Sequence, residues 1–249
     1  MSGHSKWATI KHQKGAKDKA RGKLFAKLIR QIEVAAREGG GNIDTNPTLR
    51  SMVAKAKSSS VPNDTIDRAI KRGTGELEGV SYESITYEGY APGGVAIMVD
   101  VLTDNRNRTG SEVRNAFSKA GGSMAEPGAV SWQFSRKGVV IVPKSFGEDD
   151  VMMVALDAGA DDIVDDGDTW RVTCEPSAVF AVRDALEGAS ITVDSAETSL
   201  ISSTTVALTT AEDAKKVLKV LDALEDHDDV QDVYSNFDIP DDILQAVEA

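Results

Sequence analysis

The chain has 249 residues, of which 41% are hydrophobic and 27% are charged, a composition typical of a globular protein and not of a disordered one. Its longest unbroken apolar run, Val151–Leu156, is too short to cross a membrane, and no apolar segment follows the basic N-terminus as a secretory signal requires. The single cysteine, Cys174, excludes an internal disulfide and a thiolate zinc site, so we expect a cytoplasmic protein.

The net charge of −12 is distributed unevenly along the chain. Residues 1–75 contain 16 Lys and Arg against 6 Asp and Glu, whereas residues 145–249 contain 5 against 26. A basic N-terminal part on an acidic protein indicates a polyanionic partner for that part. The acidic remainder should repel such a partner and confine binding to one edge of the molecule.

The first eighty residues predict an N-terminal arm followed by three helices. Apolar side chains recur at helical spacing over residues 24–36, and the glycines at 39–41 end that helix. Asn46 and Pro47 suit the N-cap and first position of a second helix, and a third helix follows Pro62. Each helix has one narrow apolar face, so we expect the three to pack together.

From about residue 81 the pattern changes to alternating strands and helices. Apolar residues alternate over residues 95–101, which predicts a strand. Thr109 and Glu112 form the capping-box pattern T-x-x-E and predict the start of a helix. The alternation of apolar residues over Val130–Phe134 predicts a further strand.

Residues 138–196 predict the order βαββαβ, which is the ferredoxin-like arrangement. A tight hairpin is expected at Asp166-Gly167, and the last strand of the set at Ile191–Val193. Beyond it we expect a strand over residues 204–208 and a helix capped by Thr210.

The predicted fold class is therefore α+β with three domains. A basic helical domain with its arm occupies residues 1–80. A discontinuous α+β domain combines residues 81–135 with residues 205–249, and the ferredoxin-like set, residues 136–204, is inserted into it. The second domain should also be a ferredoxin-like sandwich, because the elements before and after the insert are each incomplete alone.

Catalytic motifs are missing from the sequence, and we predict no enzyme, no cofactor and no metal site. The chain contains neither the phosphate loop G-x-x-x-x-G-K-[ST] nor the nucleophile elbow G-x-S-x-G. His227 lies in the acidic run Glu225–Asp229, for which the alternatives are weak metal binding and a solvated helix end. The aspartates of residues 161–168 lack the ligand spacing of a calcium loop.

Residues 4–30 carry nine Lys and Arg against one acid, Asp18. Lysines bind phosphate groups as point charges, and each neutralised phosphate releases counterions. Trp7 could stack on an unpaired base or anchor the arm on the helices. The candidate nucleic-acid-binding residues of this stretch are Lys6, Trp7, Lys11, His12, Lys14, Lys17, Lys19, Arg21, Lys23 and Lys27.

A second candidate contact is the stretch D-N-R-N-R-T at residues 104–109, between a strand and a helix. Backbone N–H groups at a helix N-terminus attract anions, and Arg106 and Arg108 would strengthen that attraction. The alternative is a structural loop in which the two arginines brace neighbouring acids.

Several longer motifs in these stretches resemble those of one known family. They are SGHSKW at residues 2–7, YEGY at 87–90, PGG at 92–94 and TDNRNRT at 103–109. On these motifs the chain resembles the YebC/PmpR proteins over essentially its full length. The resemblance implies three domains around a central cleft, with the third inserted in the second, in agreement with the order of the predicted elements.

The resemblance also implies a role in gene expression. Bacterial members are described as probable transcriptional regulators that bind DNA, mitochondrial relatives as translational activators needed to make a cytochrome oxidase subunit, and other bacterial relatives as proteins tied to the ribosome. We expect a non-enzymatic, nucleic-acid-binding transcriptional regulatory protein that binds DNA through its basic N-terminal region. The alternative is a ribosome-associated translation factor that binds ribosomal RNA, because a basic arm with one aromatic residue suits irregular RNA. No membrane partner is expected, and a monomer is favoured.

Overall fold

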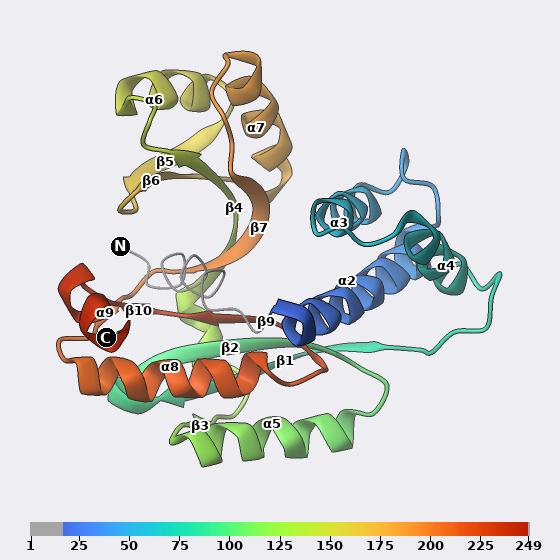
Figure 1. Ribbon diagram of the computed structural model, residues 1–249, viewed down its shortest axis with the longest axis horizontal. Coiled ribbons are helices and arrows are strands. Elements are labelled where there is room, and N and C mark those ends of the chain that lie inside the picture. The colour runs from blue at the N-terminus through green and yellow to red at the C-terminus, as the bar shows by residue number, and fades with distance from the viewer. Residues whose placement is uncertain (1–16, 249) are drawn as a thin grey trace.

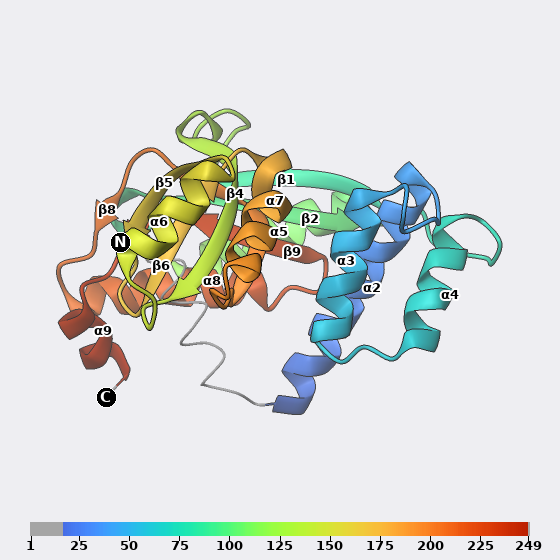
Figure 2. The ribbon, with the colours of Figure 1, turned by 90° about the horizontal axis from the view of Figure 1, so that it is seen from above.

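The computed structural model describes residues 17–248, which form three domains (Figure 1). A bundle of three helices is followed by two α+β units, each built on a four-stranded sheet. The predicted fold class, with a three-helix domain and two ferredoxin-like domains of which the third is inserted in the second, is confirmed. Figure 2 shows the helical domain lying to one side of both sheets.

The helical domain contains the three predicted helices. They are α2 (Lys17–Gly39), α3 (Pro47–Ser58) and α4 (Asn63–Gly73). Asn46 caps α3 as predicted, since its side-chain oxygen accepts a hydrogen bond from the Leu49 amide at 3.0 Å. The Asn46 side-chain nitrogen donates to the carbonyl oxygens of Ala35 and Gly40, both at 2.8 Å, and so ties α3 to the end of α2. The apolar faces of α2, α3 and α4 form a core of their own, which includes Leu28, Ile32, Leu49, Val53 and Ile66.

The first sheet has the strand order β3-β1-β2-β9 and is antiparallel throughout. Its strands are β1 (Glu83–Ala91), β2 (Val95–Thr103), β3 (Ser123–Met124) and β9 (Val230–Ser235). Helices α5 (Arg106–Ala120) and α8 (Ala211–Glu225) pack side by side on one face of this sheet (Figure 1). That face is the strand face predicted over residues 95–101, and its side chains form the largest apolar core.

The two capping predictions in this domain have different outcomes. Thr210 caps α8 as predicted, since its hydroxyl accepts from the Asp213 amide at 3.1 Å. The capping box at Thr109 is wrong, because the N-cap of α5 is Asn105, four residues before Thr109. The Asn105 side chain accepts from the Arg108 amide at 3.1 Å, and Thr109 lies buried inside the helix.

Three short elements complete this domain. Strands β8 (Val206–Ala207) and β10 (Phe237–Asp238) pair in parallel, and β8 lies within the predicted strand over residues 204–208. Helix α9 (Asp241–Glu248) follows them and was not predicted.

The second sheet has the strand order β5-β6-β4-β7, the ferredoxin-like order, and the predicted succession βαββαβ is confirmed. Its elements are β4 (Phe134–Pro143), α6 (Glu148–Asp157), β5 (Ala160–Asp165), β6 (Thr169–Cys174), α7 (Val179–Gly188) and β7 (Ser195–Ser202). The strand predicted at Ile191–Val193 is wrong, because Ile191 contributes to the core from a loop. The true last strand, β7, is an edge strand with few buried residues, so its sequence carries little apolar alternation.

The chain enters and leaves the second sheet at adjacent points. Phe134 at the start of β4 is the register partner of Ser202 at the end of β7. Next to this pair the Asn236 side chain donates to the Gln133 side-chain oxygen at 3.1 Å, and Gln133 also accepts from Thr204. β4 begins just before the predicted boundary between residues 135 and 136, and the domain boundaries themselves stay a prediction.

Candidate nucleic-acid interface

The structure places the candidate phosphate-binding residues in three groups. Lys6, Trp7, Lys11, His12 and Lys14 lie outside the described residues. Lys17, Lys19 and Arg21 lie on the first two turns of α2. Lys23, Lys27, Arg106 and Arg108 lie further along the chain, where their contacts are defined. As nucleic-acid contacts, all of these positions stay predictions.

Three cations on one face of α2 contact a single acidic segment, residues 225–229. Lys23 donates to the carbonyl oxygen of Asp226 at 2.7 Å and to its carboxylate at 2.9 Å. Lys27 donates to the carbonyl oxygen of Glu225 at 2.9 Å. Arg30, the last cation of the basic stretch at residues 4–30, donates to the carbonyl oxygen of Asp228 at 2.7 Å. The spacing of four and three residues puts all three side chains on the same side of the helix.

The acidic segment attracts these cations for two reasons. It follows the last turn of α8, where carbonyl oxygens have no partner within the helix and the helix dipole is negative. It also carries the carboxylates of Glu225, Asp226, Asp228 and Asp229. In Figure 1 the beginning of α2 accordingly lies beside the end of α8.

Asp229 is the buried member of this acidic segment, with only 8% of its side chain exposed. Its carboxylate accepts from Thr109 at 2.7 Å, from Arg108 at 2.8 Å and from Arg30 at 3.1 Å. Burial would raise the pKa of Asp229, but the hydrogen bonds from Thr109 and Arg108 and the charges of the two arginines outweigh it and hold the pKa below its usual value. Asp229 therefore joins α2, α5 and β9 as an ionised carboxylate.

The two arginines of residues 104–109 are engaged in ion pairs within the chain. Arg108 donates to Asp104 at 2.9 Å in addition to Asp229, and Arg106 donates to Glu83 at 3.3 Å. Both sides of the Arg106–Glu83 pair are largely exposed. Of the two alternatives for residues 104–109, these contacts correspond to arginines that brace neighbouring acids, although Arg106 and Arg108 lie in the first turn of α5 and not in a loop.

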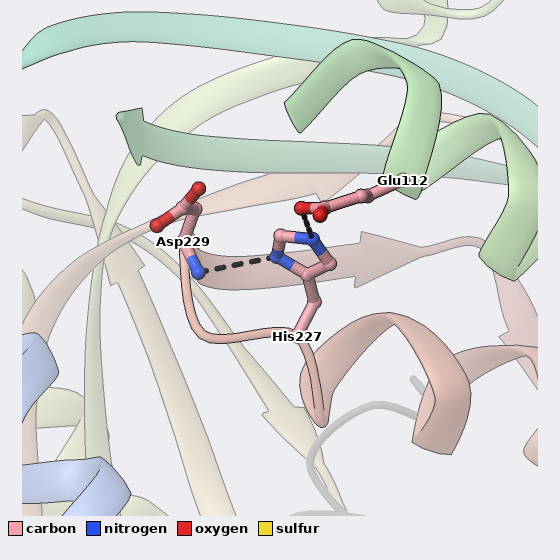
Figure 3. Close-up of side chains that lie close together, drawn as sticks. All are labelled: Glu112, His227 and Asp229. Carbon is pink, nitrogen blue, oxygen red and sulfur yellow. Dashed lines mark hydrogen bonds and ion pairs between the residues drawn. The ribbon is translucent and has the colours of Figure 1, made fainter. Parts of the chain in front are cut away.

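Glu112, His227 and Asp229 lie close enough together to be considered as a metal site (Figure 3). However, the Nδ1 atom of His227 accepts from the Asp229 amide at 3.1 Å, and its Nε2 atom lies 3.0 Å from the Glu112 carboxylate. Both ring nitrogens are therefore occupied, and two arginines already neutralise Asp229. These residues fit a hydrogen-bonded contact between α5 and the acidic segment and do not fit a metal centre. His227 is also not the solvated helix end considered from the sequence, because its side chain is mostly buried.

A further exposed feature is the Trp132 loop, residues 125–133, where the predicted strand is wrong. The buried carboxylate of Glu88 accepts from the amides of Gly128, Val130 and Ser131 at 2.7–2.9 Å. In a strand these N–H groups would donate to a neighbouring strand. Because they donate to Glu88, no strand forms here, and Ser131–Gln133 form a short 3-10 turn. Trp132 at the tip is 73% exposed. Nothing in the sequence alone identifies this loop, because Glu88 lies forty residues before it.

No helix among residues 17–248 is long and apolar enough to span a membrane.

Two family profiles match nearly all of the chain. The N-terminal domain of TACO1/YebC proteins matches residues 5–76, and the second and third domains of TACO1/YebC proteins match residues 82–237. The chain belongs to the TACO1/YebC family. The resemblance seen in the sequence motifs is thereby confirmed.

Relatives in this TACO1/YebC family are similar over the whole chain. A protein from Thermobifida fusca is 58% identical and one from Halothermothrix orenii is 53% identical, each over at least 99% of both chains. Both are called "Probable transcriptional regulatory protein". The crystal structure of a conserved hypothetical protein from Aquifex aeolicus has a TM-score of 0.82 and 46% identity, and covers 93% of this chain and 96% of its own.

Proposed function

We propose that this protein is a non-enzymatic regulator of gene expression that acts in transcription and binds DNA through its basic N-terminal region. The observation that carries the proposal is the concentration of cations in that region, 16 Lys and Arg against 6 acids over residues 1–75, in a protein that is otherwise acidic. The name of its relatives from two different bacteria supports the regulatory role.

The proposed contact is a grip on phosphate groups. The residues assigned to it are Lys6, Trp7, Lys11, His12, Lys14, Lys17, Lys19, Arg21, Lys23, Lys27, Arg106 and Arg108. Lysine recognises a phosphate as a charge and reads no base, so the contact should be nearly independent of sequence and strongly dependent on salt.

The contacts of the titratable groups support a non-enzymatic role. Among the described residues, the group most like a catalytic or metal-binding cluster is Glu112, His227 and Asp229. Its imidazole has no free nitrogen to act as a base or ligand, because one nitrogen accepts from the Asp229 amide and the other is hydrogen-bonded to Glu112 on α5.

A second candidate function, binding ribosomal RNA as a translation factor, is favoured by Trp132. An exposed indole on a loop fixed by Glu88 is a ready stacking platform for an unpaired base. Duplex DNA offers few unpaired bases, so this feature has more use on RNA.

The test is a triple substitution in the arm and at the first residue of α2, K11A/K14A/K17A, called the arm variant. Its matched control is K215A/K216A/K219A, which removes three lysines from α8 in the acidic part of the protein. Binding to a short duplex DNA and to a single-stranded RNA of equal length is measured by fluorescence anisotropy over a range of salt concentrations. The arm variant should bind both more weakly, and the slope of log affinity against log salt should fall by about one unit for each phosphate group that the variant no longer neutralises.

Wild-type affinity in the arm variant would overturn the proposed contact. To choose between the two functions, the protein is sedimented with ribosomes at moderate salt, and nucleic acid crosslinked to it in cells is sequenced. Co-sedimentation together with crosslinked ribosomal RNA would replace the transcriptional function with the translational one. Crosslinked chromosomal DNA, together with protein that stays at the top of the gradient, would support the function in transcription.

A further inference from the structure

We propose that the acidic segment, residues 225–229, is an internal competitor for nucleic acid. In this view it covers the cationic face of α2 until phosphate groups replace it, and the helical domain then moves away from α8. The inference rests on the proposed function, since it concerns how the same cations become available to a polyanion.

The first support is that the acidic segment offers the cations of α2 what a nucleic acid would offer. Lys23, Lys27 and Arg30 are each bound to oxygen atoms at 2.7–3.1 Å. Along the helix axis these side chains start about 6 and 4.5 Å apart, at about 1.5 Å per residue. Phosphates two steps apart along one strand of a duplex are about 6.8 Å apart along its axis, so a phosphate backbone can meet the same row of charges.

The second support is that the joint between α2 and the acidic segment is polar. The apolar core of the helical domain is separate from the core around the first sheet, so moving the two apart need not open either core. The carboxylates of Asp226 and Asp228 are 79% and 73% exposed. Lys23, the partner of both, has 26% of its side chain exposed. Ion pairs with such exposed carboxylates are screened by salt, so a polyanion can compete with them.

The third support is that Asp229, the buried carboxylate of the acidic segment, keeps two of its partners after the displacement. Arg30 would have to leave Asp229, whose side chain is mostly buried. Asp229 would keep its bonds from Arg108 at 2.8 Å and from Thr109 at 2.7 Å. An ion pair between the helical domain and the insert, Lys55 with Glu197 at 3.2 Å, is exposed on both sides and is equally easy to break.

The first experiment removes two of the four carboxylates of the acidic segment in the full-length protein with D226N/D228N. The control D157N/E187Q removes two exposed carboxylates from the inserted domain, so the net charge changes equally. The probes are a single-stranded RNA and a duplex DNA of equal length. We expect D226N/D228N to bind the preferred probe about threefold to tenfold more tightly than the wild type, and the control to change affinity by less than about twofold.

The second experiment measures the movement. Ala54→Cys in α3 and Lys219→Cys in α8 place two fluorescent labels on exposed positions, while the buried Cys174 is shielded from labelling. Saturating oligonucleotide should lengthen the distance between the labels, measured by energy transfer. An unchanged distance in a complex that forms normally would overturn the inference.

The outcomes separate this inference from the proposed function. Equal affinities of the wild type, D226N/D228N and the control would overturn the competitor while leaving nucleic-acid binding in place. If only D226N/D228N binds nucleic acid, that result would support both the proposed function and the role of the acidic segment as a competitor. Absence of binding by all three proteins would overturn the proposed function, and the competitor with it.

Discussion

Asp229 joins three elements that are distant in sequence, and its ionisation state decides how strongly it does so. Its partners come from α2 and from α5, and they hold its pKa below the ordinary value of an aspartate. A carboxyl whose pKa is lowered in the folded state stabilises the fold at any pH above its unfolded pKa of about 3.9. That stabilisation disappears as the pH falls through the folded pKa.

We predict that Asp229→Asn destabilises the protein by about 1.5–3 kcal/mol at neutral pH, the usual contribution of hydrogen bonds to a charged group. Asp228→Asn, a change at the exposed neighbouring position, should cost less than about 0.5 kcal/mol. Chemical denaturation at a series of pH values would measure both. The gap between the wild type and D229N should stay constant from pH 7 to about pH 5 and narrow below about pH 4. A gap that widens in acid would contradict the assigned ionisation.

The Trp132 loop shows how one buried side chain can fix a whole element. Glu88 accepts three backbone hydrogen bonds from the loop, and the Tyr90 hydroxyl donates a further one to the carbonyl oxygen of Ala129 at 3.1 Å. Burial favours the neutral form of Glu88, but these backbone N–H groups outweigh it and lower its pKa.

We predict that Glu88→Gln destabilises the fold by about 1–3 kcal/mol, because an amide has one acceptor oxygen and would leave an N–H of the loop without a partner. Glu126→Gln, in the exposed part of the same loop, is the control and should be nearly neutral. Denaturant unfolding measures the stability. Tryptophan emission from a variant that retains Trp132 as its only tryptophan reports whether the loop has changed. Equal stabilities of the two variants would show that Glu88 does not organise the loop.

Local signals in the sequence predicted most of the helices and strands. Of the contact between α2 and the acidic segment, they predicted only the cations of α2. Asn46 and Thr210 were identified as caps because their hydrogen bonds stay within three residues. The lysines of α2 were identified because Lys and Arg are concentrated over residues 4–30. Their partner, the acidic segment, lies about two hundred residues further along the chain, and no local pattern connects the two. Trp132 was predicted to lie in a strand because apolar residues alternate at Val130, Trp132 and Phe134. That alternation gives no sign that Glu88, forty residues earlier, binds the backbone and holds it as a loop.

The three domains are joined in different ways. The helical domain meets the rest of the protein through ion pairs and hydrogen bonds, whereas the insert shares an apolar cluster with the first sheet that includes Ala96, Met98 and Tyr234. Each domain nevertheless has an apolar core of its own. The molecule should therefore tolerate removal of the insert better than disruption of any single core strand.

We predict that replacing residues 136–200 by Asn-Gly leaves the other two domains folded. Ser135 and Ile201 are register partners, so a two-residue turn can close the chain between them. Dispersed amide signals in the NMR spectrum and a cooperative thermal transition would check the result. The control keeps the whole insert and places Asp in the first sheet at Val99, which should unfold the domain. Collapse of both variants alike would show that the insert is needed for the rest to fold.

The cations of α2 bind main-chain oxygen atoms as well as carboxylates, with Glu225, Asp226 and Asp228 each contributing a carbonyl. Every amino acid supplies a carbonyl oxygen, so mutation of the acidic segment cannot remove these three hydrogen bonds. Selection can therefore act more freely on the exposed side chains at positions 226 and 228 than on Asp229, whose carboxylate is bound by three side chains, while the basic residues of α2 have no such substitute. Across related organisms Lys23, Lys27 and Arg30 should change slowly and positions 226 and 228 quickly, even though the two surfaces stay together.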